Sequence, residues 1–373
     1  MKKSFCTRLG VALACLALCA GSASAETGGR WENEYEAYGR KITVNVEICV
    51  PEKEQIPFLA VAPMEELPAR ETEKYREYFG SMDRSGSESV FSSKRNRIII
   101  DYSDYVHHPD LSNAEKVTTP NRTLTEFDRD TAYTEDNDLT VGEAEQLVNG
   151  NIGMVYPSVS FRVLDVVAND RTKYRKTGEK LSDKGYYELD CMQVFDGVPL
   201  AGSVHGAYRR RIKHDFIMAD YGTAYINATD RNHFGGSYEL WDVTGEPGMP
   251  DRLLSFDEAR PAIEKLILSG NIRRVYHVYL GYAQYDMPEG SPYEYVLAPA
   301  WVFRVGWMDD PEEDTATEKS VNGTDLAEGC IYLPVIVNAV SGEVTYPLDE
   351  GEGRMLLPAS CLMAIPEIAE PET

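Results

Sequence analysis

Histidine is scarce in this chain: there are six histidines in 373 residues, and none stands in an HExxH or another spaced metal-binding pattern. The sequence also lacks a Gly-x-Ser-x-Gly nucleophile elbow, a Cys-x-x-Cys pair and a glycine-rich phosphate loop. These absences remove the usual sequence signals of zinc proteases, serine hydrolases, thioredoxin-like enzymes and nucleotide-binding proteins. We therefore expect a protein that is not an enzyme and that uses no metal ion or cofactor.

Basic side chains are also in the minority, with 37 lysines and arginines against 61 aspartates and glutamates and a net charge of −24. Nucleic acids and anionic lipids are bound by neutralising their phosphates with Lys and Arg. The charge balance therefore excludes a nucleic-acid role. Two acidic clusters, at residues 128–138 and 309–314, lack the glycine and glutamate spacing of a calcium loop, so we interpret both as solvated loops.

Long apolar runs are absent except at the N-terminus. There, Lys2, Lys3 and Arg8 precede an apolar run over residues 9–20, and small residues follow up to Ala25. A basic start, a short apolar core and an A-x-A ending are typical of a secretory signal peptide. The run is too short to span a bilayer, which needs about 20 residues. We expect cleavage after Ala25, location outside the cytoplasm in the envelope or medium, and no later transmembrane segment.

Cysteine is used sparingly, with seven residues in the chain. Cys15 and Cys19 lie within the expected signal peptide, which leaves lipid attachment there as an alternative, although the large Leu18 precedes Cys19. The cysteines beyond the cleavage site are too far apart in sequence to indicate a zinc site. In an oxidising compartment they could form two disulfides in any of three connectivities, or remain free thiols. They are Cys49, Cys191, Cys330 and Cys361.

Alternating apolar residues predict strands near the start of the mature chain. In residues 41–50 (KITVNVEICV), Ile42, Val44, Val46 and Ile48 would share one buried face. Further strands are predicted at residues 55–61 and 97–102, a helix-prone segment at 65–79, and a loop or linker at 110–138.

One pattern occurs twice. Thr140 with Glu143, and Ser255 with Glu258, have the spacing of a capping box, in which hydroxyl and carboxylate satisfy the first free amides of a helix. A helix with apolar residues at helical spacing follows each box, and the two helices are expected to end near Asn149-Gly150 and Gly270-Asn271. Strands are then predicted at residues 161–167, 186–195 and 212–218, and at 275–282, 293–307 and 331–337.

This duplication predicts an α+β fold. Two repeated units, each a capped helix followed by an antiparallel β-meander, would follow an N-terminal β-containing region. The expected divisions are a signal peptide at 1–25, an N-terminal α+β region with an acidic linker at 26–138, repeat units at 139–250 and 251–350, and a C-terminal tail at 351–373.

The second unit resembles a PepSY-type module. Residues 254–272 (LSFDEARPAIEKLILSGNI) have its Ser-x-x-Glu-Ala helix start, and residues 338–344 (NAVSGEV) have its closing hairpin. Three further stretches extend the resemblance over the mature chain: residues 42–51 (ITVNVEICVP), 186–200 (YYELDCMQVFDGVPL) and 253–259 (LLSFDEA). With them the chain resembles an uncharacterised family of exported lipoproteins of gut Firmicutes with tandem modules of this kind. Its two halves distantly resemble YycH/YycI-type regulators of a cell-wall sensor kinase. The resemblance implies a non-enzymatic regulator or inhibitor of the envelope, and it carries over no catalytic residue.

Two groups of residues are candidates for a binding surface. Three aromatic residues on one strand face would either pack in the core or form a stacking platform for a sugar or peptide: Trp301, Phe303 and Trp307. Three consecutive basic residues would either pair with the protein's own carboxylates or bind an anionic wall polymer or partner: Arg209, Arg210 and Arg211. We hypothesise a protein that binds an envelope protein. The alternatives are a module that binds carbohydrate or wall polymer, and an unrecognised hydrolase with a deep polar pocket.

Overall fold

The computed structural model describes residues 26–53, 55–64, 70, 89–94, 97–102, 114–118, 121–124, 127–134, 139–175, 177, 180–201, 223–230, 233–307, 331–345, 357–362 and 365. Several predicted features lie outside these residues. They are the signal peptide, the basic cluster at 209–211, the strand at 212–218, the acidic cluster at 309–314 and all but one residue of the helix-prone segment at 65–79.

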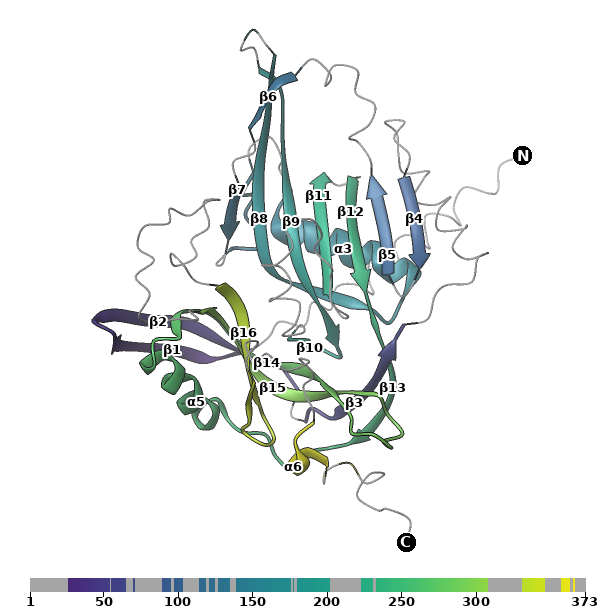
Figure 1. Cartoon of the computed structure of the whole chain (residues 1–373). Coiled ribbons are helices and arrows are strands. Elements are labelled where there is room, and N and C mark those ends of the chain that lie inside the picture. Colours follow the sequence, from purple (N-terminus) through teal and green to yellow (C-terminus); the bar gives the residue numbers. More distant parts are fainter. Residues whose placement is uncertain are drawn as a thin grey trace.

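Two β-sheets, one above the other in Figure 1, form the framework of the described protein. Sheet A has the strand order β1-β2-β14-β15-β16-β17, with β3 beside β15 and β13 beside β3. Its neighbours pair antiparallel except β2 and β14, which pair parallel. Its strands are β1 (Glu26–Ala37), β2 (Arg40–Val50), β3 (Phe58–Pro63), β13 (Trp241–Gly248), β14 (Ile272–Asp286), β15 (Tyr295–Trp307), β16 (Ile331–Asn338) and β17 (Val344–Thr345).

Sheet B is antiparallel, with the order β4-β5-β12-β11-β9-β8-β6, and with β7 beside β8 and β10 beside β9. Its strands are β4 (Ser89–Lys94), β5 (Arg97–Tyr102), β6 (Ala114–Thr118), β7 (Asn121–Leu124), β8 (Ser160–Arg175), β9 (Lys180–Phe195), β10 (Val198–Pro199), β11 (Thr223–Asp230) and β12 (His233–Glu239).

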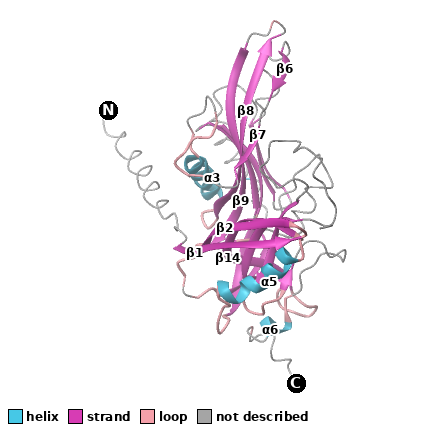
Figure 2. Ribbon diagram, turned by 90° about the vertical axis from the view of Figure 1, so that its left-hand side faces the viewer, coloured by secondary structure: helices cyan, strands magenta, loops and turns pink. Residues whose placement is uncertain are grey.

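One longer helix covers each sheet, and Figure 2 shows them at separate levels of the molecule. Helix α3 (Val141–Val155) buries Ala144 and Val148 in a core that it shares with β8 and β9 of sheet B. Helix α5 (Phe256–Leu268) buries Ala259 and Ile263 against sheet A. The short helix α6 (Ala359–Leu362) places Cys361 in a third apolar cluster beside β15 and β16. Apolar residues at helical spacing therefore fix both longer helices to their sheets.

The predicted α+β fold of two repeated helix-plus-meander units is wrong, because the protein is mostly β-sheet. Strands far apart in sequence complete each sheet: β2 joins β14, and β5 joins β12. The strands expected to form a separate N-terminal region are thus divided between the two sheets. Apolar alternation shows that a strand is half-buried, but it does not identify the strand that will pair with it.

The local predictions of strands were more successful. In β2 the side chains of Ile42, Val44, Val46 and Ile48 are buried and the residues between them are exposed, as the alternation predicted. Strands β3, β5, β8, β9, β14, β15 and β16 also cover or overlap predicted spans. The loop predicted at residues 110–138 is wrong in part, since β6 and β7 lie within it and pair with β8.

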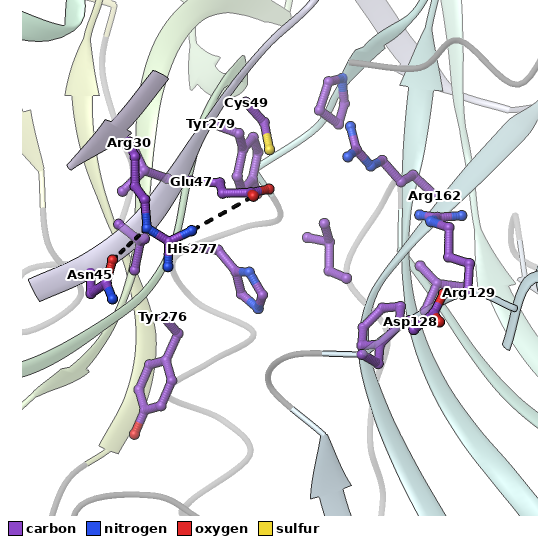
Figure 3. A pocket seen from close by; sticks show the side chains of 16 residues that line it. Arg30, Asn45, Glu47, Cys49, Asp128, Arg129, Arg162, Tyr276, His277 and Tyr279 are labelled. Carbon is purple, nitrogen blue, oxygen red and sulfur yellow. Dashed lines mark hydrogen bonds and ion pairs between the residues drawn. The ribbon is translucent and has the colours of Figure 1, made fainter. Parts of the chain in front are cut away.

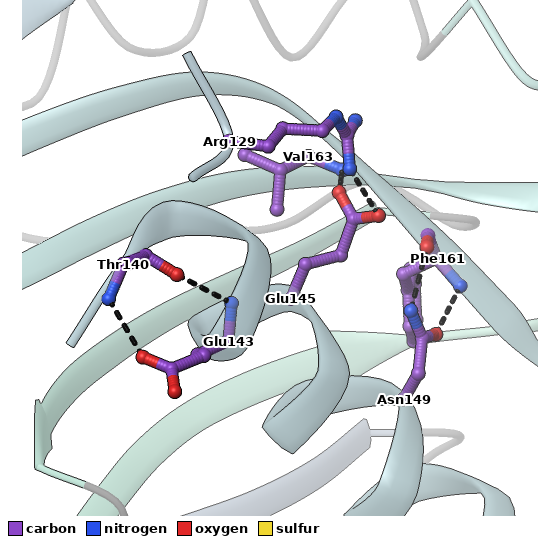
Figure 4. A network of polar contacts seen from close by, with 7 residues as sticks. All are labelled: Arg129, Thr140, Glu143, Glu145, Asn149, Phe161 and Val163. Carbon is purple, nitrogen blue, oxygen red and sulfur yellow. Dashed lines mark hydrogen bonds and ion pairs between the residues drawn. The ribbon is translucent and has the colours of Figure 1, made fainter. Parts of the chain in front are cut away.

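Both capping boxes are confirmed, but only one of the two predicted helix ends is correct. Helix α5 ends at Leu268, and Gly270 follows with a left-handed φ of 79°. Helix α3 instead continues past Asn149 to Val155. The Asn149 side chain accepts a hydrogen bond from the Phe161 N–H (2.6 Å) and donates one to the Phe161 carbonyl (2.9 Å), so it joins the helix to β8 instead of ending it (Figure 4).

The second capping box makes the start of α5 sensitive to acid. The Glu258 carboxylate accepts hydrogen bonds from the Ser255 N–H (2.8 Å) and from Arg252 (2.7 Å). These contacts lower the pKa of Glu258 from 4.5 to about 2. Because the folded-state pKa is the lower one, the stabilisation is complete above the unfolded-state pKa and is lost as the pH falls through the folded-state pKa.

We therefore expect the Glu258 carboxyl carbon to titrate near pH 2 in an NMR experiment. In Arg252→Ala its pKa should rise part of the way back, since the Ser255 amide remains. In the Glu258→Gln variant the free energy of unfolding should no longer contain the decrease at low pH that comes from protonation of Glu258. A Glu258 midpoint at the ordinary value of 4.5 would contradict the capping-box geometry in solution.

Candidate functional site

A cleft of about 550 Å³ opens where the two sheets meet. Residues of β1, β2 and β14 form the wall that belongs to sheet A (Figure 3). Residues at the start of β8, Pro199 of β10 and residues 127–129, which precede α3, form the opposite wall. The cleft therefore depends on how the sheets meet and not on any single motif.

The alternation of β2 determines the character of the first wall. Because Val44, Val46 and Ile48 face the core of sheet A, Asn45, Glu47 and Cys49 project from the other side of the strand. Those polar side chains line the cleft. The same alternation that buries one face of the strand thus supplies the polar groups of the site.

Three arginines line the cleft, Arg30, Arg129 and Arg162, and two of them already have carboxylate partners. The Arg30 guanidinium donates a hydrogen bond to the Asn45 side chain and lies 3.2 Å from the Glu32 carboxylate and 3.7 Å from that of Glu47. These partners are exposed, so solvent screens the ion pairs.

Arg129 is held more firmly (Figure 4). Its guanidinium pairs at 2.5 Å with Glu145 of α3, whose side chain is 14% exposed. The second carboxylate oxygen of Glu145 accepts a hydrogen bond from the Val163 N–H of β8 at 2.8 Å. Glu145 therefore ties the helix, the strand and Arg129 together at the margin of the cleft.

Arg162 differs from the other two arginines. It is half-buried on β8, next to Val163, and lines the cleft. Within the part of the chain that the structure describes, its guanidinium makes no hydrogen bond or ion pair. A guanidinium presents several donors in a planar fork that matches a carboxylate or phosphate. The acidic residues Glu47 and Asp128 also line the cleft. The cleft wall is therefore positively charged only around its arginines.

The three aromatic residues for which core packing and a binding platform were the alternatives lie in the core of sheet A. Trp301, Phe303 and Trp307 are 3%, 0% and 3% exposed. The Trp301 indole N–H donates to the Leu254 carbonyl (2.7 Å), and the Phe256 ring of α5 packs edge-on against it at 5.7 Å. A stacking platform needs an accessible ring face, which these side chains do not have. The basic residues Arg209, Arg210 and Arg211 lie outside the described residues.

Cys49, Cys191 and Cys361 form no disulfide within the described residues. Cys191 and Cys361 are buried, and burial raises the pKa of the Cys361 thiol. Cys49 is half-buried and lines the cleft, while Cys330 lies outside the described residues. Cys49 is thus a natural chemical probe of the cleft.

No group of three or more His, Cys, Asp or Glu side chains within the described residues is arranged to hold a metal ion. Among the helices described here, none is long and apolar enough to cross a membrane.

Sequence reasoning missed the arginines of the cleft, because they are far apart in the chain and each is single in its own segment. Arg30 of β1 and Arg162 of β8 line the same cleft because sheets A and B meet there. One local signal was present: Arg162 interrupts the apolar stretch FRVLDVV of a predicted strand. A charged residue at such a position indicates a site where the strand faces something other than the core.

These features describe a two-sheet β-protein with an arginine-lined cleft between the sheets. No family model, curated protein or solved structure matches the chain. The resemblance to families with PepSY-type modules therefore stays a prediction.

Proposed function

We propose that the protein is a non-catalytic binding protein of the bacterial cell envelope or medium, and that the cleft holds an anionic group of its ligand. The observation that carries this proposal is Arg162, a half-buried arginine in a cleft, with no partner among the described residues, in a chain of net charge −24. A guanidinium at such a position gains a charge-assisted, bidentate contact when a carboxylate or phosphate enters. The export part of the proposal rests on the N-terminal sequence.

The walls of the cleft also indicate what accompanies the anionic group. Phe127, Leu164 and Val278 line the cleft together with the arginines. Binding sites for small molecules combine apolar walls with a few polar groups that fix orientation. We therefore favour a ligand that joins a carboxylate or phosphate to an apolar body. The non-catalytic part of the proposal is supported by a sequence without a recognised catalytic motif.

Cys49 allows a direct test. In the mature protein (residues 26–373) carrying Cys330→Ser, the neutral reagent N-ethylmaleimide should react with Cys49 and spare the buried Cys191 and Cys361. Phenylacetate, succinate and inorganic phosphate serve as probe anions. We expect at least one of them to slow the labelling of Cys49. Calorimetry should show no binding of phenylacetamide, the neutral analogue of phenylacetate.

The Arg162→Gln variant should weaken binding of the effective anion by roughly tenfold or more, because a charge-assisted bidentate contact is lost. The matched control is Lys265→Gln, which removes one positive charge from the exposed face of α5. Equal labelling rates with and without all three anions would overturn the proposal, as would equal losses of affinity in the two variants.

A further inference from the structure

The outer edge of β1 is an exposed strand edge at the end of sheet A. Among the described strands, β1 pairs only with β2 and lies at the end of sheet A. The two strands are joined through Tyr38 and Gly39, which have positive φ angles of 52° and 68°. Two consecutive residues with positive φ are typical of the type I′ turn of a tight hairpin. Figure 1 shows this hairpin extending from the side of sheet A.

The turn determines which backbone groups of β1 face outward. In a two-residue hairpin the flanking residues, here Ala37 and Arg40, form a hydrogen-bonded pair, and bonded and non-bonded pairs then alternate along the strands. The backbone of Glu36, Glu34 and Glu32 therefore points away from β2. The Glu34 N–H agrees with this assignment, since it donates to the side chain of Asn33 at 2.9 Å.

The side chains along this edge are acidic. Glu32, Glu34 and Glu36 are exposed and alternate along the strand, so they lie on one face. Lys41 lies 2.5 Å from Glu34, and Arg30 pairs with Glu32, but both contacts are exposed ion pairs of low strength. The edge therefore keeps an excess of negative charge.

This charge selects among strands that could pair with the edge. An antiparallel second copy of β1 would place glutamates close to glutamates, and like charges on neighbouring strands are destabilising. A strand with Lys or Arg at every second position would place a positive charge beside each glutamate, while its backbone bonds to the outward amides and carbonyls. Charged edges commonly prevent indiscriminate pairing, and here the same charges favour a basic strand.

We propose that the β1 edge pairs with an extended segment of a partner protein that carries Lys or Arg at every second position. Addition of a strand to an exposed sheet edge is a recurrent mode of peptide recognition, in which backbone hydrogen bonds supply affinity and alternate side chains supply specificity. The Asn33 amide satisfies the Glu34 N–H in the free protein and is displaced when the partner's carbonyl arrives.

A synthetic peptide tests the proposal. A fluorescein-labelled peptide in which lysine alternates with threonine or valine should bind the mature protein in a fluorescence anisotropy titration at low salt. Hydrogen exchange should show slower exchange of the Glu32, Glu34 and Glu36 amides when the peptide is bound. The same peptide methylated at alternate backbone nitrogens keeps its charge but cannot pair, and it should not bind.

Matched protein variants separate pairing from general attraction. The triple variant Glu32→Gln, Glu34→Gln, Glu36→Gln should bind the peptide roughly tenfold more weakly, as expected for three lost cross-strand charge pairs. The control Glu246→Gln, Glu289→Gln, Glu294→Gln removes three exposed negative charges from other parts of the chain and should change affinity by less than about threefold, because distant exposed charges are screened. Binding of the methylated peptide, equal losses in both triple variants, or no binding to the native protein would each overturn the proposal.

Discussion

Replacing Gln193 with alanine is expected to lower the free energy of unfolding by about 2–5 kcal/mol, because it removes two buried hydrogen bonds to the backbone of the other sheet. Gln193 lies on β9 of sheet B and is 2% exposed. Its side-chain amide donates to the Trp241 carbonyl (2.8 Å) and accepts from the Trp241 N–H (3.0 Å). Trp241 begins β13 of sheet A and is 1% exposed, so water cannot replace the lost bonds. Urea unfolding monitored by tryptophan fluorescence measures the change.

Asn149 provides the matched control. Its amide makes the same pair of hydrogen bonds, to the N–H and carbonyl of Phe161, but from a half-buried position on α3. Water can reach this position, so Asn149→Ala should cost less than Gln193→Ala. If Asn149→Ala lowered the free energy of unfolding as much as Gln193→Ala or more, the buried hydrogen bonds between the sheets would contribute no more to stability than half-buried ones. The comparison thus isolates burial as the cause of the effect.

The elements of the fold that depend on neighbouring residues could be predicted from the sequence. Thr140 and Ser255 form capping boxes because the partner glutamate lies three residues away, and β2 is half-buried because its own side chains alternate. The predicted assembly of these elements was wrong, since β2 pairs with β14 more than 200 residues later in the chain. Pairing over such distances is decided by the packing of whole faces, which local patterns do not encode.

The candidate site was unpredictable for the same reason. Its side chains come from β1, β2, β8, β14 and the residues before α3, so no spacing in the sequence unites them. For the aromatic residues of β15 the sequence left core packing and a binding platform as alternatives, and the structure shows core packing. The alternation of Trp301 and Trp307 predicts large apolar contacts on one strand face, and helix α5 covers that face of sheet A. Aromatic alternation indicates burial as readily as binding, and the decision depends on whether another element covers the face.

The cleft and the junction between the sheets are parts of one structure. Pro199 and Tyr279 line the cleft, and both also contact the position of Gly281 in β14. The segment that follows β10 runs beside β14 there in a parallel bridge, and the Ala201 N–H donates to the Tyr282 carbonyl at 2.6 Å. The geometry of the cleft therefore depends on how closely β10 approaches β14.

Alanine at position 281 should disturb this approach and lower the free energy of unfolding by about 2–3 kcal/mol. A Cβ atom at position 281 would lie 2.5 Å from the backbone carbonyl oxygen of Pro199 and 3.1 Å from the Tyr279 ring. The oxygen belongs to the backbone, so β10 itself must move, and the bond from Ala201 to Tyr282 is strained or lost. Urea unfolding measures the stability. N-ethylmaleimide labelling should show faster reaction of Cys49, because Pro199 is displaced from the cleft wall.

Gly150→Ala is the control for adding the same methyl group elsewhere. Position 150 lies within α3, and an added Cβ would meet no other atom within 4 Å. Alanine has the higher helix propensity, so this variant should be more stable by about 0.5–1 kcal/mol and should leave the Cys49 labelling rate unchanged. A lower free energy of unfolding in Gly281→Ala together with a higher one in Gly150→Ala would show that the loss at position 281 comes from the contact with β10. If Gly281→Ala were as stable as the native protein, the close approach of β10 to β14 would not exist in solution.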